Sequence, residues 1–157
     1  MSDCHFCQKI QSIPTSTTGD LVWTFPNSHL FLGKWQFYHG YCVLVSKAHE
    51  KELFFLNDST RKSFLEELNF SARAIFDAFL PAKMNYELLG NQVPHLHWHL
   101  FPRYKDDPQA LSPVWLRLDQ AEKVPSEHAI ATTGKGTSEK TIQMIQAKLK
   151  QLGAPRG

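Results

Sequence analysis

The sequence predicts an α+β fold with about five antiparallel strands in one sheet, one long helix and a short helix near the C-terminus. Three observations support this prediction. Segments rich in β-branched and aromatic residues alternate with turn residues before position 50, apolar residues then recur at helical spacing, and two more strand-like segments follow before position 104. A chain of 157 residues is long enough to bury a core in one domain.

The strands are expected wherever apolar and β-branched residues are bounded by turn signals. Pro26-Asn27 separates the first two, and a polar and aromatic stretch leads to the third. Short connections between these three predict antiparallel pairing. The five segments are Leu21–Phe25, His29–Gly33, Gly40–Ser46, Lys83–Gly90 and His95–Arg103.

One long helix is predicted between the third and fourth strands. Asp58 or Ser59 is its expected N-cap, and Pro81 follows its end. Its apolar face consists of Phe64, Leu65, Leu68, Ala72, Ile75, Phe76 and Phe79. Beyond Asp106 the pattern fades into a proline-containing loop, and a short amphipathic helix is expected from about Ser138 to Leu152.

The composition argues against several kinds of partner. A formal net charge of +2 is too small for bulk electrostatic binding of nucleic acid or an anionic membrane, so neither is expected. No apolar run is long enough to cross a bilayer, and the polar start MSDCHFCQKI is not expected to be a signal peptide. Three cysteines, two of them in a C-x-x-C pair, favour a reducing compartment, and we expect a cytoplasmic protein.

The segment PHLHWHLFPRY places a histidine at every second position. Alternate side chains of a strand share a face, so His95, His97 and His99 are expected on one face of the fifth strand. The apolar residues between them would pack on the long helix and hold the register, because a slip of one residue would bury three imidazoles. These residues are Leu96, Trp98 and Leu100.

Three interpretations of the histidine face are open. It could be the polar side of a half-buried strand. The imidazoles could instead chelate a catalytic metal, as in a metallohydrolase. Alternatively, one imidazole could be a nucleophile towards phosphorus while its neighbours bind an anionic substrate. Phe101-Pro102-Arg103 supplies no further metal ligand, and an arginine suits phosphate, so the sequence favours the nucleophile.

The pattern resembles that of the histidine-triad (HIT) family, His-φ-His-φ-His-φ-φ, where φ is apolar. Here it reads HLHWHLF, a full match. GYCVLVSKAHEKEL resembles the family's glycine-led strand ending in a histidine, and NYELLGNQVPH resembles its asparagine followed by a polar turn. The resemblance covers about Cys4 to Asp107. It implies a HIT-like catalytic domain at residues 1–110, with residues 111–157 as a C-terminal extension, a loop and a short helix, within the same domain.

The resemblance also implies a nucleotidyl hydrolase that acts on dinucleoside polyphosphates or nucleoside phosphoramidates. His97 would attack the α-phosphorus and form a covalent nucleotidyl-histidine, which water then hydrolyses. His95 would orient His97 through its backbone carbonyl, and His99 would contact the phosphate and assist the leaving group. The polar positions that contact phosphate in the family are Asn85, Asn91 and Gln92. Family members often form dimers with a continuous sheet, so a homodimer is expected.

The C-x-x-C pair could be a redox pair or half of a structural zinc site with four protein ligands. Some HIT proteins hold zinc with such a pair, the histidine after the glycine-led strand and the first triad histidine. The resemblance therefore implies a zinc cofactor bound by Cys4, Cys7, His49 and His95. His5 is a rival ligand, whereas Cys42 is predicted to be a small buried residue.

Two positions depart from the family pattern. Gly33 stands where many members carry an aspartate or asparagine for the ribose hydroxyls, and the family's Pro-Gly-His reads His39-Gly40-Tyr41. Both departures concern nucleoside recognition, and they leave a non-catalytic nucleotide-binding module as an alternative. Aromatic residues that could form a base pocket or belong to the core are Trp23, Phe25 and Phe31.

Overall fold

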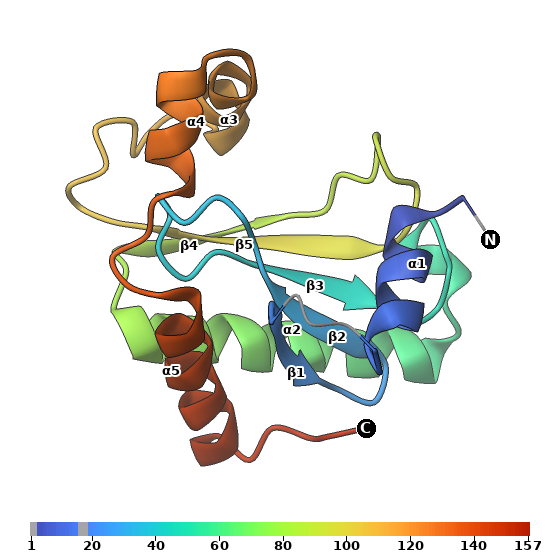
Figure 1. The fold of residues 1–157 in the computed structure, drawn as a ribbon. Coiled ribbons are helices and arrows are strands. Elements are labelled where there is room, and N and C mark those ends of the chain that lie inside the picture. Colours follow the sequence, from blue (N-terminus) through green and yellow to red (C-terminus); the bar gives the residue numbers. More distant parts are fainter. Residues whose placement is uncertain (1–2, 16–18) are drawn as a thin grey trace.

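The computed structural model of the protein describes residues 3–15 and 19–157. In this part of the chain five antiparallel strands form one sheet in the order β1-β2-β3-β5-β4 (Figure 1). They are β1 (Leu21–Thr24), β2 (Ser28–Leu32), β3 (Cys42–Ser46), β4 (Lys83–Glu87) and β5 (His97–Arg103). The predicted α+β class and five-stranded antiparallel sheet are confirmed.

Helices cover both faces of the sheet (Figure 1). They are α1 (His5–Ser12), the 3-10 turn η1 (Leu53–Phe55), α2 (Asp58–Phe79), α3 (Val114–Lys123), α4 (Pro125–Thr132) and α5 (Ser138–Gln151). The long α2 lies under one face with α5, while α3 and α4 lie over the other and α1 lies at one end. No helix in the described residues has the length and apolar character needed to span a membrane.

Local sequence explains both ends of α2. The N-cap is Asn57, one residue before the predicted Asp58 or Ser59, and its side chain accepts a hydrogen bond from the Thr60 N–H at 2.9 Å. Leu80 closes the helix in the left-handed conformation with φ 51°, and a proline follows. The predicted helix is therefore present, with its start shifted by one residue.

Alternation along the strands divides the core into two layers. The layer under the sheet joins strand residues such as Leu44 and Leu100 to the inward faces of α2 and α5. The layer above the sheet contains Tyr41 and Phe101, which pack with Val114, Leu118 and Ala121 of α3. The C-terminal extension therefore packs on both faces of the sheet. Three buried residues of α3 pack above it, and three apolar residues of α5 pack below it: Ile142, Ile145 and Leu149.

Three helices were not predicted. The expected loop beyond Asp106 contains α3 and α4, with Pro113 as the N-cap of α3 and Pro125 as the first residue of α4. Proline is tolerated at these positions because the first N–H groups of a helix have no intrahelical partner. The N-terminal α1 has only eight residues and none of them is buried, so no long apolar face marks it in the sequence.

Candidate active site and metal centre

His97 and His99 lie in β5, and His95 lies two residues before the strand begins, not at its first residue as predicted. The rings of His95 and His97 are buried, with 1% and 5% exposure, and His99 is half-buried. The apolar residues between the histidines pack on the opposite side of the strand, in the core with α2: Leu96, Trp98 and Leu100. The expected alternation therefore holds the register of the triad.

A chain of hydrogen bonds fixes the protons on the rings. His97 Nδ1 lies 2.6 Å from the His95 carbonyl oxygen, which only accepts, so Nδ1 is protonated and Nε2 keeps the lone pair. His97 Nε2 lies 3.1 Å from His99 Nε2, and the Tyr41 hydroxyl lies 2.7 Å from His99 Nδ1. Assigned from this network, Tyr41 donates to His99 and His99 donates to His97. In the same way His95 Nε2–H donates to the Ser46 carbonyl at 2.8 Å.

Burial keeps the two cleft histidines neutral. Desolvation lowers the pKa of His97 from its ordinary value, and the hydrogen bond to the His95 carbonyl opposes this in part. Desolvation, with a smaller effect of the His97 charge, lowers the pKa of His99 to about 3. Neutral imidazole is the nucleophilic form, so His97 has the protonation state that attack on phosphorus requires.

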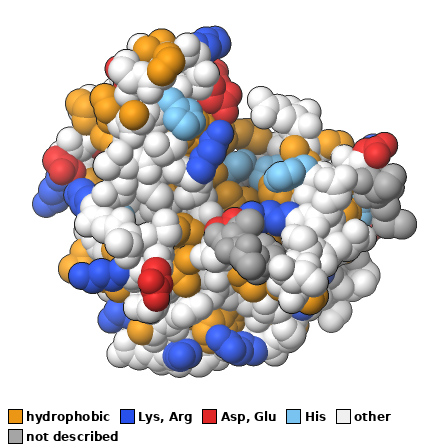
Figure 2. Space-filling view, viewed as in Figure 1, with side chains coloured by type: hydrophobic (Ala, Val, Ile, Leu, Met, Phe, Trp, Pro, Cys, Tyr) orange, Lys and Arg blue, Asp and Glu red, His pale blue; other side chains and the backbone are white. Residues whose placement is uncertain are grey.

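Two adjoining pockets of about 310 and 550 Å³ form a cleft at these rings. Their shared lining residues are Phe6, Gln92, His99 and Trp115. The smaller pocket also reaches His97 and Asn91, so the structure brings two of the predicted phosphate-contacting residues, Asn91 and Gln92, to the triad. Figure 2 shows histidine side chains inside a hollow of the molecular surface.

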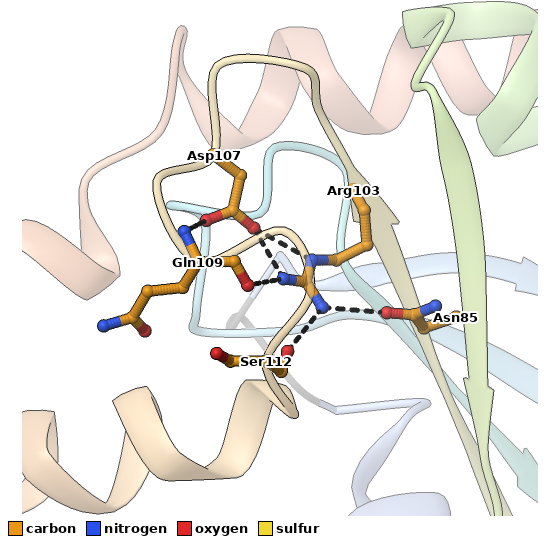
Figure 3. A network of polar contacts seen from close by, with 5 residues as sticks. All are labelled: Asn85, Arg103, Asp107, Gln109 and Ser112. Atoms are coloured by element: carbon orange, nitrogen blue, oxygen red, sulfur yellow. Dashed lines mark hydrogen bonds and ion pairs between the residues drawn. The ribbon is translucent and has the colours of Figure 1, made fainter.

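Asn85 and Arg103 lie away from this cleft. Arg103 is 4% exposed, and its guanidinium donates to the Asp107 carboxylate, the Asn85 side-chain oxygen and the carbonyls of Gln109 and Ser112 (Figure 3). All five N–H groups are used within the protein, which corrects the expectation that this arginine binds phosphate. Asn85 lines a different pocket from the triad, so the structure does not bring it to the other predicted binding residues. The network instead ties the loop after β5 to β4.

Cys4, Cys7, His49 and His95 form a compact cluster in which all ligand atoms lie within 4.8 Å of one another. The Sγ–Nδ1 distances are 3.4 Å for Cys4–His95 and 3.1 Å for Cys7–His49, and the two Nδ1 atoms are 3.2 Å apart. A tetrahedral zinc ion with bonds of about 2.0–2.3 Å has ligand separations of roughly 3.3–3.8 Å.

The protonation of the His95 ring in this cluster is also compatible with metal binding. Because His95 Nε2–H donates to the Ser46 carbonyl, its Nδ1 is unprotonated and available as a ligand. Two cysteines and two histidines are a donor set that zinc prefers. The four predicted residues thus fit zinc, whereas His5, the rival ligand, lines the larger pocket.

A sequence profile of the HIT domain matches residues 15–106, which is more than half of the chain. The chain belongs to the HIT domain family. It is 29% identical over 110 residues to Protein hit from Bacillus subtilis (strain 168), a match that covers 65% of this chain and 72% of that protein. The triad lies inside the matched range, while Cys4, Cys7 and the C-terminal extension lie outside it.

Solved HIT structures share the fold of this HIT protein. A histidine triad protein from Sinorhizobium meliloti is 21% identical with a TM-score of 0.65, and the match covers 96% of this chain and 98% of that one. A Zn-bound histidine triad family protein from Mycobacterium smegmatis is 18% identical with a TM-score of 0.66, covering 97% and 96%. At these identities the likeness establishes the fold alone.

Three residues of the HIT site were not predicted: Phe6, Tyr41 and Trp115. Phe6 lies between the two cysteines of the cluster, and its ring centroid is 4.6 Å from that of His97. Tyr41 stands at one of the two positions that depart from the family pattern, so the sequence did contain a signal that this residue is unusual. Trp115 lies in α3, a helix that no sequence pattern predicted.

The predicted base-pocket aromatics have different locations. Phe31 lines the larger pocket beside Gly33 and Lys34. Trp23 and Phe25 are in the core, with 3% and 0% exposure. Phe31 is also only 3% exposed, so of the three it alone borders the cleft, with a small part of its surface.

Proposed function

We propose that this HIT protein is a nucleotidyl hydrolase that acts at the α-phosphate of dinucleoside polyphosphates or nucleoside phosphoramidates. Family membership supports a nucleotide-binding or nucleotide-hydrolysing protein. The observation that carries the finer proposal is the His97 ring, whose Nδ1–H is held by the His95 carbonyl while the ring lines the cleft. An oriented neutral imidazole is a competent nucleophile without a separate base.

In the first step His97 Nε2 attacks the α-phosphorus. An N–P bond forms, the bond from phosphorus to the leaving group breaks, and the leaving atom takes the electron pair. An anionic phosphate beside His99 raises the pKa of this ring, so His99 takes up a proton at Nδ1 when substrate binds, and the Tyr41 hydroxyl then turns to accept from it. His99 passes its Nε2 proton to the leaving atom. In the second step water attacks phosphorus, the N–P bond breaks with its electrons returning to His97, and the water proton passes to His99.

Polar side chains of the turn before β5 would stabilise the phosphate. Asn91 and Gln92 line the smaller pocket with His97 and His99, and their amide N–H groups are suitable donors to phosphoryl oxygens. Donors placed where negative charge develops lower the barrier without reorganisation during the reaction. The proposal assigns these two residues, and not Asn85, to substrate binding.

The cluster of Cys4, Cys7, His49 and His95 would hold a structural zinc ion. Four protein ligands leave no coordination position for substrate or water, so the ion would hold α1 and His95 in place. It is the one group of three or more metal-ligating side chains found within the described residues. His97 Nδ1 is engaged with a carbonyl, so a metallohydrolase using the triad as ligands has less support than the nucleophile.

Substitution of His97 by alanine tests the proposal. His97→Ala should lower kcat for a nucleoside phosphoramidate by about 10³-fold or more while the thermal unfolding temperature changes little. The matched control is His128→Ala, an exposed histidine of α4, which should keep wild-type rates. Acid quenching of the wild-type reaction should trap a nucleotidyl adduct on His97 in a peptide mass spectrum. Full activity of His97→Ala, or the lack of any adduct or turnover in the wild type, would contradict it.

We also infer that two copies associate through β4. This strand stands at one end of the strand order, so its outer backbone groups have no neighbouring strand in the described sheet. Exposed apolar side chains lie on it and near it: Tyr86, Leu89, Leu111 and Leu116. A second copy presents the same edge about a two-fold axis, and antiparallel pairing of the two β4 strands would extend the sheet.

A further inference from the structure

Trp115 brings the C-terminal extension into the active-site cleft. It is half-buried in α3, and within residues 111–157, all of which are described, it alone lines both pockets. Its ring centroid lies 5.0 Å from that of His99 with an interplanar angle of 79°, and 5.8 Å from that of Phe101. The indole is therefore in contact with the third triad histidine.

Glu87 fixes the orientation of this indole. Trp115 Nε1–H donates to the Glu87 carboxylate. Glu87 lies in β4 directly opposite His99 in the register of β4 and β5, so one pair of strands positions both the indole and the imidazole. The helix itself is anchored by Val114 and Leu118, each 1% exposed. A side chain held in this way loses little freedom when a ligand packs on it.

The smaller pocket has the lining that a planar apolar group requires. Three apolar side chains surround the space beside Trp115, namely Phe6, Leu89 and Val93. An indole face attracts another aromatic ring through stacking as well as through burial, whereas a saturated ring of similar size gains the burial only. The larger pocket, of about 550 Å³, is the better fit in volume for a nucleoside, so the leaving group would occupy the smaller one, of about 310 Å³.

We infer that Trp115, oriented by Glu87, selects substrates whose leaving group carries a planar aromatic ring. The inference rests on the proposed hydrolase function and narrows its substrate class. An aromatic amine in a phosphoramidate, or the second nucleobase of a dinucleoside polyphosphate, has such a ring, and an alkyl amine does not. Trp115 is thus a specificity-determining residue that the C-terminal extension adds to the HIT site.

Two phosphoramidates that differ in planarity test this inference. The adenosine 5′-phosphoramidates of benzylamine and of cyclohexylmethylamine have similar leaving amines, one ending in an aromatic ring and one in a saturated ring. The wild type should favour the benzylamine compound in kcat/KM, and Trp115→Leu should lower this preference roughly tenfold, as expected for loss of one stacking contact. Trp115→Phe, which keeps an aromatic face, should retain part of the preference.

Glu87 variants and a neighbouring control separate selectivity from stability. Glu87→Ala removes the acceptor of the indole N–H and should lower the preference about threefold, while Glu87→Gln keeps an acceptor and should restore most of it. Gln120→Ala changes an exposed residue of α3 that lines neither pocket and should leave the preference unchanged. A purely structural role of Trp115 would lower both rates equally and would not alter their ratio.

Binding without turnover keeps this inference separate from the proposed function. Calorimetric titration of the two compounds into His97→Ala and into His97→Ala/Trp115→Leu measures affinity with no reaction. The second substitution should weaken binding of the benzylamine compound and not of the cyclohexyl compound. Equal weakening, or none, overturns the role of Trp115. Absence of turnover in the wild type together with selective weakening would overturn the hydrolase proposal and not the recognition of the ring.

Discussion

At the scale of single residues, Tyr41 links the two positions that depart from the family pattern. Its hydroxyl lies 2.7 Å from His99 Nδ1, and its ring stacks on Phe101 with centroids 4.0 Å apart. A Cβ atom at Gly33 would lie 2.2 Å from the Tyr41 ring, so this position has no room for a side chain while the ring is there. Gly33 and Tyr41 therefore fit together sterically in the wall of the cleft.

Tyr41→Phe should lower kcat about tenfold, the effect expected for loss of one hydrogen bond that orients a reacting group. Burial raises the pKa of the Tyr41 hydroxyl, so this group stays protonated and acts as a donor that fixes the His99 tautomer. The loss should be greater for leaving groups of higher pKa, because these depend most on proton transfer from His99. Steady-state kinetics with a series of leaving groups measures this dependence.

Tyr38→Phe is the matched control for this variant. Tyr38 is 1% exposed in the same core layer, and its hydroxyl has no hydrogen-bond partner in the described part of the chain. Removing it should leave kcat unchanged and should not lower stability. Equal losses of kcat in both variants would show that the hydroxyl of Tyr41 contributes only to packing of this layer.

At the scale of elements, Glu67 joins α2 to the turn between β1 and β2. It is 1% exposed, and its carboxylate accepts hydrogen bonds from the Asn27 backbone N–H at 2.9 Å and from the hydroxyls of Ser28 and Ser63. A buried carboxylate is stable only when its oxygens have such partners. This contact holds the first hairpin of the sheet on the long helix.

Glu67→Leu should lower the free energy of unfolding by about 2–4 kcal/mol, because the buried donors of the turn would lose their acceptor. Glu66→Leu is the matched control at the adjacent exposed position and should change stability by less than about 0.5 kcal/mol. Urea unfolding followed by circular dichroism measures both. Similar small effects in the two variants would mean that water can replace the carboxylate in the turn.

Sequence periodicity predicted the elements that bury a regular apolar face. The five strands, α2 and α5 have such faces, and each was found within a few residues of its expected bounds. The pattern failed for α3, whose buried face has only three residues, and for α1, which buries none. Leu65 and Phe76 have the spacing of the inward face of α2 but are 41% and 40% exposed, because no element covers that side fully.

The site was predictable where local geometry determines it. Alternation along one strand placed His97 and His99 on a common face. The cluster of two cysteines and two histidines was implied by the resemblance to the HIT family and not by local geometry, and its four residues do meet. Arg103 and Asn85 pair with each other away from the triad cleft, and this pairing depends on the loop that follows β5, which has no periodic signal. Contacts between distant elements, as for Trp115, also leave no trace in a single sequence.

At the scale of the whole molecule, the cluster of Cys4, Cys7, His49 and His95 connects the N-terminal helix to the segment before β5. The cluster joins α1 to the segments that follow β3 and precede β5. Because α1 buries no residue, few apolar contacts hold it on the sheet. Phe6, which packs on His97, depends on the same attachment.

Purified protein should therefore contain about one zinc ion per chain. Removal of the zinc should detach α1 under conditions in which the sheet remains folded. Elemental analysis measures the content, and limited proteolysis after chelation should cut within the first 20 residues while the rest of the chain stays protected. Cys7→Ser should lose the metal, whereas Cys42→Ala, a buried cysteine away from the cluster, should retain it. Full zinc content in Cys7→Ser would show that the ion lies elsewhere.

Association through β4 would make the sheet continuous across two copies and cover part of the apolar surface near the extension. Light scattering should give twice the mass of one chain at micromolar concentration. Tyr86→Lys places a charge on each side of the two-fold axis, where the copies would face each other, and should shift the protein towards a monomer. Leu65→Lys, at an exposed position of α2, is the matched control and should remain dimeric. If both variants keep the wild-type mass, the edge of β4 is not the contact, because a buried pair of like charges would not be tolerated there.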